Sequence, residues 1–246
     1  MSARVTFATT HRVLAQLRHD PRTIALLVLV PSLLQTLIWW LYNDRSPLIF
    51  DAVGPMLVCL FPFLVMFLVT SIATLRERTS GTLERLFTMP LAKLDLLLGY
   101  AVAFGVVALV QSGLVVSISV GVLGLDLVGS VVVLLIVALA DALLGVALGL
   151  FVSAFARTEF QAVQFMPLIV LPQFLLCGFL LPRGSMPQTL EWISNALPLS
   201  YAVDAARLVT TSPAISGGLV RDCAVVLGSV VLALALGAVT LRRRTD

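Results

Sequence analysis

Apolar residues along this chain gather in six long runs that are separated by short polar stretches. The runs cover residues 24–41, 52–75, 96–120, 127–156, 160–181 and 223–241. A helix needs roughly 20 residues to cross the hydrocarbon core of a bilayer, and the runs have about this length or more. A spanning segment must satisfy its backbone polar groups internally, and no short alternating strand pattern competes with the helical one. The pattern therefore predicts an all-α integral membrane protein with six transmembrane helices.

The composition supports this reading and narrows the class of protein. Hydrophobic residues make up 59% of the 246 residues, charged residues only 12%, and the mean hydropathy is +1.06. An ordinary globular domain has about a quarter of its residues charged, so this chain lacks the polar surface of a water-soluble body. The net charge of +3 is small and its cations are scattered, which excludes nucleic acid as an expected partner.

The positions of the cations predict the orientation in the membrane. With six spans and both termini on the same side, twelve of the 16 Lys and Arg residues fall on that side and four on the other. Lys and Arg are retained in cytoplasmic loops, so both termini are expected in the cytoplasm. About 20 mixed polar residues precede the first run, which is not typical of a signal peptide.

Residues 1–21 form a segment of their own kind. Four apolar residues share one side of a helical wheel, namely Phe7, Val13, Leu14 and Leu17. Arg12 and Gln16 point away from that side, as expected for a helix that lies in the membrane interface. An unstructured lead-in remains the alternative. Asp20 precedes Pro21, and the residue before a proline is disfavoured in a helix, so a break is expected before the first span.

The loop over residues 76–92 is short, charged and on the expected cytoplasmic side. Ser80 and Gly81 suit a turn, after which Leu83 and Phe87 fall on one helix face until Pro90 stops the helix. A short amphipathic helix of this kind can dock into a groove on a soluble partner. A merely solvated loop is the alternative from the residues alone.

This loop resembles the signature loop of ABC-2 type transporter permeases. The matching motif is Glu77-x-x-x-Gly81-Thr82-Leu83-Glu84-x-Leu86, followed by Pro90 and Gly99. The segment Arg18-x-Asp20-Pro21-Arg22 is similar to the family's elbow helix before the first span. A third stretch resembles the family's outer hallmark and contains Gly178, Pro182, Pro187, Pro198, Tyr201 and Arg207. Cys177 precedes Gly178 where many members have serine, which is a mild departure.

The resemblance implies one ABC-2 transmembrane domain over residues 1–246. Residues 1–21 would form the elbow helix, 76–92 the coupling loop and helix, and 182–200 the re-entrant outer helices between the fifth and sixth spans. The residues implied in coupling to the ATPase are Glu77, Arg78, Gly81, Thr82, Leu83, Glu84 and Arg85.

The resemblance also implies partners. A permease of this family works with a separate ATPase subunit in two copies, which holds ATP and Mg²⁺, and with a second permease that is identical or homologous. Lys93 is the chain's only lysine and lies outside any G-x-x-x-x-G-K-[ST] loop, so no ATP site, cofactor or catalytic residue is expected on this chain. The implied location is the bacterial inner membrane, in contact with membrane lipid.

Asp141 is the one ionisable residue deep inside an expected span. Burial of a carboxyl in a membrane is costly, so the position of Asp141 needs an explanation. It either lies on the transport path or in a proton-linked switch, or it is a neutral or hydrogen-bonded group that contacts Gln111, Ser112 or Gln164. An intramembrane aspartyl protease would need a second aspartate at this depth, and Asp126 lies at the outer edge. The three cysteines lack metal-ligand spacing, so no metal site is expected.

Phenylalanines concentrate in the second and fifth runs, which flank the transport path in the family. The candidate path consists of Phe61, Phe63, Phe67, Phe174 and Phe179, with Asp141. Such a path suits a hydrophobic or amphipathic drug or antibiotic, and export of a lipid or glycoconjugate is the alternative. Lipid-facing packing is the simpler explanation of any single phenylalanine. A secondary carrier or membrane scaffold is a more distant alternative, because no internal repeat is visible.

Overall fold

The computed structural model describes residues 3–43, 47–80 and 93–240. Six helices in these ranges are long and apolar enough to cross a membrane. They are α2 (Pro21–Asn43), α3 (Pro47–Thr79), α5 (Lys93–Gly121), α6 (Val131–Ser153), α7 (Glu159–Leu176) and α10 (Gly217–Thr240). The described ranges contain helices and no strand. The all-α fold and the six spans expected from the sequence are thus confirmed.

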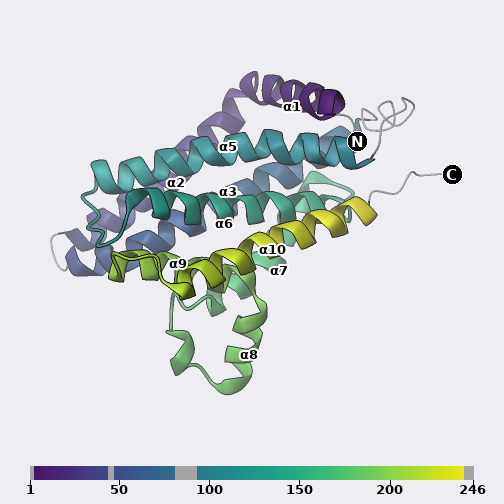
Figure 1. Cartoon of the computed structure of the whole chain (residues 1–246). Coiled ribbons are helices and arrows are strands. Elements are labelled where there is room, and N and C mark those ends of the chain that lie inside the picture. Colours follow the sequence, from purple (N-terminus) through teal and green to yellow (C-terminus); the bar gives the residue numbers. More distant parts are fainter. Residues whose placement is uncertain (1–2, 44–46, 81–92, 241–246) are drawn as a thin grey trace.

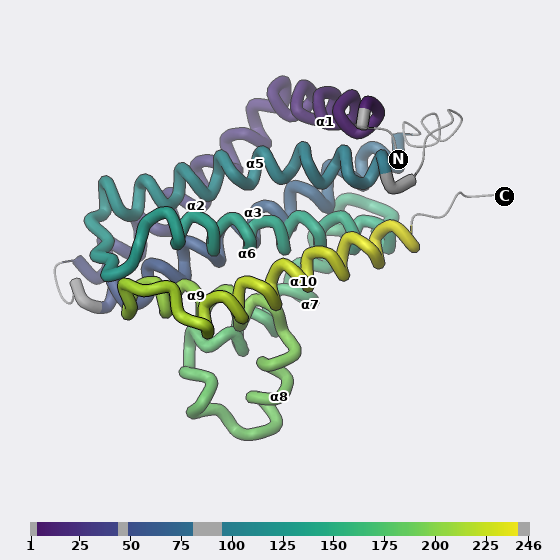
Figure 2. The backbone as a smooth tube through the Cα atoms, viewed as in Figure 1, coloured from purple at the N-terminus to yellow at the C-terminus, as the bar shows by residue number. Residues whose placement is uncertain are grey.

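The long helices lie side by side, as Figures 1 and 2 show, and a shorter helix lies against them at one end. This helix, α1 (Ala3–Arg18), packs on α5. We call this end of the bundle the α1 end. The last turns of α3 and α10 and the first turn of α5 are also found there, close to both ends of the described chain (Figure 1).

Helices α3 and α6 form the centre of the bundle because their backbones are in direct contact. A Cβ atom on Gly145 would lie 2.4 Å from the carbonyl oxygen of Phe63, and one on Gly149 would lie 2.6 Å from that of Phe67. The two glycines are one helical turn apart on α6, and small residues at this spacing allow membrane helices to approach closely. Gly145 and Gly149 thus fix the position of α6 against α3.

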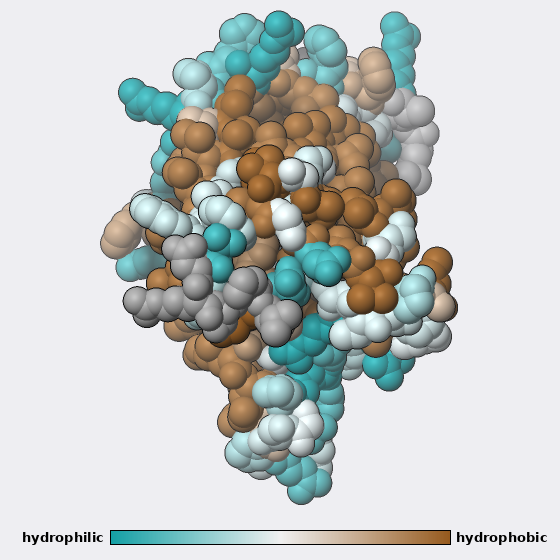
Figure 3. Space-filling model, turned by 90° about the vertical axis from the view of Figure 1, so that its left-hand side faces the viewer, coloured by the Kyte–Doolittle hydropathy of each residue, from teal (hydrophilic) through white to brown (hydrophobic). Residues whose placement is uncertain are grey.

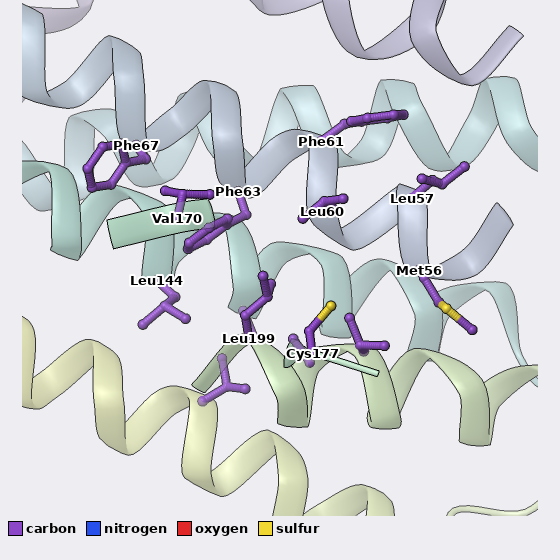
Figure 4. Packing of buried hydrophobic residues seen from close by; sticks show 14 of the residues in the cluster. Met56, Leu57, Leu60, Phe61, Phe63, Phe67, Leu144, Val170, Cys177 and Leu199 are labelled. Carbon is purple, nitrogen blue, oxygen red and sulfur yellow. The ribbon is translucent and has the colours of Figure 1, made fainter. Parts of the chain in front are cut away.

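Large apolar side chains fill the space between these helices and the outer ones. Figure 4 shows Phe63 and Phe67 of α3 in one cluster with Leu144 of α6 and Val170 of α7. Other large apolar residues face outward on α2 and α10, where a bilayer would surround them. Viewed from the end opposite to the α1 end, hydrophobic residues cover much of the upper body, and hydrophilic residues lie at its top, across its middle and on the part that projects at the bottom (Figure 3). An apolar exterior around a packed apolar interior is what a membrane-spanning bundle requires.

Two spans are shorter than their apolar runs. The fourth span was expected from residue 127 but α6 begins at Val131, because Ser130 before it has an extended backbone, with a φ of −79° and a ψ of 131°. The fifth was expected to reach residue 181 but α7 ends at Leu176, since Gly178 has a φ of 91°. Hydropathy alone does not detect these helix ends.

Three short helices connect α7 to α10. They are the 3₁₀ helix η1 (Arg183–Ser185), α8 (Gln188–Ala196) and α9 (Pro198–Thr211). A proline stands at the start of each, Pro182, Pro187 and Pro198, where its missing N–H has no helical partner to lose. Helix α8 projects from the side of the bundle, at the bottom of Figures 1 and 3. Short helices were expected over 182–200, and α9 continues beyond that range.

Helix α1 lies before the first span, but its faces differ from those expected. Val13 is buried, and Leu14 and Leu17 pack against the same cluster, as the wheel predicted. Phe7, however, is 74% exposed. Arg12 was expected to point away from the apolar side of the helix. It points toward α3 and α5 instead, because the Glu77 carboxylate and the Tyr100 hydroxyl bind its guanidinium.

Candidate functional site

The last turn of α3 directs three consecutive charged side chains to different helices. Successive residues on an α-helix point about 100° apart, so Arg76, Glu77 and Arg78 face three directions. All three lie at the α1 end, directly before the segment 81–92. We call these residues and their partners the α3 network.

Glu77 connects α3 with α1 and α5. Arg12 of α1 donates from Nη1 to Oε1 at 3.1 Å and from Nη2 to Oε2 at 2.9 Å. The hydroxyl of Tyr100 on α5 donates to Oε2 of Glu77 and accepts from Arg12 Nη2 at 2.9 Å. Only 29% of the Arg12 side chain and 12% of the Glu77 side chain are exposed. A bidentate pair with this little exposure is stronger than an ordinary surface ion pair.

Arg76 connects α3 with α7 and with the turn between α1 and α2. Its Nε donates to Glu159 Oε1 at 2.7 Å, in the first turn of α7, and its Nη1 lies 4.0 Å from Asp20 Oδ2. Asp20 also caps α2, accepting from the Thr23 hydroxyl at 2.7 Å and from two backbone amides. These hydrogen bonds, above all that from the Thr23 hydroxyl, lower the pKa of the Asp20 carboxyl.

Arg78 connects α3 with the end of α6. Its Nη1 donates to the carbonyl oxygen of Ser153, the last residue of α6, at 2.7 Å. The last carbonyls of a helix lack helical donors and carry partial negative charge, so a guanidinium is a favourable partner. Through its last turn, α3 is therefore connected to α1, α5, α6 and α7.

Close packing of α1 on α5 depends on Gly99. The Thr10 hydroxyl donates to the carbonyl oxygen of Gly99 at 3.1 Å, and a Cβ atom on Gly99 would lie 2.5 Å from Thr9 Cβ. Gly99 belongs to the sequence motif of the loop, and its structural role is to allow this approach. The Thr10 hydrogen bond and the close approach at Gly99 thus fix the orientation of α1 on α5, and with it the position of Arg12.

The structure locates only part of the expected coupling and elbow residues. Glu77 and Arg78 lie in the α3 network, whereas Gly81, Thr82, Leu83, Glu84 and Arg85 lie outside the described residues. Of the expected elbow residues, Arg18 is exposed at the end of α1, Asp20 and Pro21 begin α2, and Arg22 lines a cavity beside them. Sequence reasoning did not identify Arg12, Tyr100 or Glu159 as partners.

A second polar network surrounds the turn after α7. Gly178 takes the left-handed conformation there, and Arg207 of α9 donates to its carbonyl oxygen. Arg183 donates to Asp204 of α9, and its guanidinium lies 5.0 Å from the centre of the Tyr201 ring. Burial raises the pKa of Asp204, and the hydrogen bond from Arg183 lowers it by less.

Helix α8 is attached to this network mainly at its C-terminal end. The Tyr201 hydroxyl donates to the carbonyl oxygen of Asn195 at 2.8 Å, and the Ser194 hydroxyl donates to that of Leu176 at 2.7 Å. Gly178, Tyr201 and Arg207, three residues of the predicted outer hallmark, thus lie in one network. Ser194 and Asp204 were missed, because short polar side chains in amphipathic helices carry no distinctive sequence signal.

The candidate path residues fall into two groups in the single chain. Phe61, Phe63 and Phe67 are buried in the core of the bundle. Phe174 and Phe179 are partly buried at the end of α7, with ring centres 5.4 Å apart. The second pair is the more accessible part of the proposed path.

Asp141 is fully buried on α6, and neither of its carboxylate oxygens has a hydrogen-bond partner among the described residues. The expected hydrogen bonds to Gln111 or Ser112 are not formed, and both of these side chains are themselves buried without partners in the described structure. Gln164 lies on the exposed side of α7. Helical spacing had given the depth of these residues but not the direction of their side chains.

The six apolar helices form a bundle, and charged residues gather at the last turn of its central helix α3, which we call the foot of α3. This arrangement defines a multi-pass membrane protein. The chain belongs to the ABC-2 type transporter family, whose family model matches residues 4–210. The match includes α1, the α3 network and nearly all of α9.

Several curated proteins are similar to this chain. The inner membrane transport permease YhhJ of Escherichia coli is 32% identical over 141 residues, which are 57% of this chain and 38% of that protein. The probable multidrug ABC transporter permease YbhR of Escherichia coli is 29% identical over 160 residues, 64% of this chain and 43% of that protein. ABC transporter G family member 20 of Dictyostelium discoideum is 27% identical over 166 residues, 68% of this chain and 23% of that protein. The matched region thus spans less than half of each relative.

Proposed function

We propose that this chain is the membrane-spanning subunit of an ATP-driven exporter that moves a hydrophobic or amphipathic drug or antibiotic out of the cell. The observation that carries the proposal is the α3 network. Arg76, Glu77 and Arg78 connect the end of α3 to four other helices, directly before the family's signature loop. A force applied to that loop would reach most of the bundle through these contacts.

The energy for transport comes from a partner in this proposal. Two copies of an ATPase subunit bind ATP and Mg²⁺ and close on ATP binding, and residues 77–85 receive that movement. Because membrane helices are stiff, displacement of the foot of α3 tilts the spans and changes access to the path. The chain itself binds no cofactor.

The α1 end faces the cytoplasm in the bacterial inner membrane, and both termini lie there. The support is the distribution of cations along the sequence: twelve of the 16 Lys and Arg residues belong to the termini and the connections on one side of the six spans. The charged network at the foot of α3 lies on the same side. An ATPase in the cytoplasm would meet the loop 81–92 at this end.

A second permease, identical or homologous, covers one side of α7. The outward stripe of this helix contains a polar residue, Gln164, and two prolines, Pro167 and Pro172. Each proline removes a helical N–H, so the carbonyl oxygens of Val163 and Leu168 lose their helical donors. Polar groups without hydrogen-bond partners are costly in lipid, and another protein chain in contact with α7 would supply those partners.

Two observations favour a drug or antibiotic as the substrate. The Phe174 and Phe179 rings lie together at the end of α7, where an apolar or aromatic molecule would contact them. The relatives YbhR and YbhS carry the name of probable multidrug permeases. Export of a lipid or glycoconjugate uses the same architecture, and a substrate panel distinguishes the two.

The test is purification of the chain together with an ABC-type ATPase subunit that is produced in the same cells. The proposal predicts a stable complex whose ATP hydrolysis rises with hydrophobic drugs but not with lipids or glycoconjugates from the same panel. A matched complex with a catalytically inactive ATPase should bind the same drugs without transporting them. Recovery of a stable assembly that holds no ATPase and moves substrate with an ion gradient would overturn the proposal.

A further inference from the structure

A cavity of about 800 Å³ lies at the α1 end, between α1, the first turns of α2 and the last turns of α3. Its apolar walls include Leu17 of α1, Leu26 of α2, Leu68 and Ile72 of α3, and Phe104 of α5. The volume falls within the range of roughly 300–1,000 Å³ that is typical of ligand sites. The α3 network borders the cavity but does not fill it.

The cavity is polar at its rim and apolar deeper in the bundle. Asp20, Arg22, Arg76 and Glu77 line the rim. Arg76 and Leu68 are eight residues apart on α3, so a rise of 1.5 Å per residue puts them about 12 Å apart along the helix. The polarity therefore changes in the direction in which a bilayer changes, from the headgroup level to the hydrocarbon.

The charges at the rim are paired, with one exception. Arg76 forms an ion pair with Glu159, and Glu77 forms one with Arg12. Arg22 forms no ion pair within residues 3–43, 47–80 and 93–240, and it lines the cavity from the first turn of α2. Its guanidinium is thus the cation at this rim that is free to bind an anionic group.

We propose that this cavity binds one phospholipid from the leaflet at the α1 end. The headgroup phosphate contacts Arg22, whose planar guanidinium can donate two parallel hydrogen bonds to phosphate oxygens. An acyl chain extends along Leu26, Leu68 and Ile72, which lie at the depth where hydrocarbon begins. A bound lipid fills the space beneath α1 and so supports the contact of α1 with α3.

The test uses the full chain, purified in detergent and stripped of lipid, with native mass spectrometry to count bound molecules per chain. The probe is palmitoyl-oleoyl-phosphatidylglycerol, and dioleoylglycerol serves as a probe without phosphate. Arg22→Gln removes the phosphate contact. Arg18→Gln is the matched control, because Arg18 is an exposed arginine four residues away that does not line the cavity. Ala73→Phe places a ring into the cavity from α3.

We expect one tightly bound phosphatidylglycerol per chain in the wild type and in Arg18→Gln. Loss of a hydrogen bond to a charged group should weaken this binding at least about tenfold in Arg22→Gln. Ala73→Phe should lower occupancy as well, and dioleoylglycerol should bind as weakly to the wild type as phosphatidylglycerol does to Arg22→Gln. Equal affinity in Arg22→Gln and the wild type, equal loss in Arg18→Gln, or equally tight binding of dioleoylglycerol would each overturn the proposal.

Discussion

Arg12 and Glu77 form a bidentate ion pair across 65 residues of sequence, with N–O distances of 3.1 and 2.9 Å. The pair joins α1 to the last turn of α3, and the Tyr100 hydroxyl joins α5 to both partners. Because α1 and α5 are also packed closely through Gly99, movement of the foot of α3 cannot leave α1 unaffected. This contact gives α1 a direct structural link to the last turn of α3.

Replacement of Arg12 by glutamine should destabilise the folded protein by about 1–3 kcal/mol, because Glu77 is left partly buried without its charged partner. Thermal unfolding of the detergent-solubilised chain measures the loss. Arg18→Gln, at an exposed position of the same helix, should change the stability by no more than about 0.5 kcal/mol. The double variant Arg12→Gln, Glu77→Gln should lose less than the two single losses added together. Strict additivity would show that the pair contributes nothing.

Replacement of Gly145 by alanine should destabilise the bundle by about 1–3 kcal/mol, because the new Cβ would lie 2.4 Å from the Phe63 carbonyl oxygen and the helices would have to separate. Gly113→Ala is the control, since a Cβ at that position meets nothing within 4 Å. Alanine there should stabilise α5 by about 0.5–1 kcal/mol. Unfolding temperatures of the two variants should therefore shift in opposite directions, and a shift of the same sign would refute the close contact of α3 and α6.

Asp141→Leu should not lower the stability of the fold. The carboxyl is fully buried without a hydrogen-bond partner in the described structure, and an apolar side chain of similar volume removes that cost. Unfolding temperature provides the measurement, and a loss as large as that of Gly145→Ala would contradict the expectation. Transport by the folded variant then separates the two roles of Asp141: retained transport indicates a structural group, and lost transport indicates a group on the path.

The pH dependence of stability should contain a contribution from Asp204. Burial raises the pKa of this carboxyl in the folded protein, so the folded state keeps its proton to higher pH than the unfolded state does. The stability that this residue contributes is therefore present below the unfolded pKa of about 3.9 and is lost as pH rises through the raised value. Between pH 4 and pH 7, the unfolding temperature of the wild type should fall relative to that of Asp204→Asn. A constant difference would show that burial does not control this carboxyl.

The sequence predicted the spans well because hydropathy over some 20 residues reports directly on the bilayer. The break at Asp20 and Pro21 was predicted from the restriction that a proline places on the preceding residue, whereas the short helices after α7 were expected only from the resemblance to the ABC-2 family. The partners of Arg12 could not be predicted, because a helical wheel gives the direction of a side chain relative to its own helix only. Glu77 and Tyr100 come from distant parts of the chain, and their convergence depends on how α1 packs against α5 through Gly99.

The predicted hydrogen bonds of Asp141 with Gln111 or Ser112 were wrong for a related reason. The sequence predicts Asp141 deep inside a span and names Gln111 and Ser112 among its candidate neighbours, but a hydrogen bond requires the right rotation of α5 against α6. That rotation is set by packing, including the approach of Gly105 to Leu143. The network around the turn after α7 also depends on a left-handed Gly178, which makes α7 end before its apolar run does.

Substrate-stimulated ATP hydrolysis by the assembled complex tests most directly whether this chain transmits movement through the foot of α3 and the signature loop. Glu77→Gln and Glu84→Ala should leave the complex assembled and its basal hydrolysis intact, yet remove most of the stimulation by drug and the transport that accompanies it. Arg18→Gln should behave as the wild type. Full stimulation and transport in both Glu77→Gln and Glu84→Ala would contradict the coupling role proposed for this region.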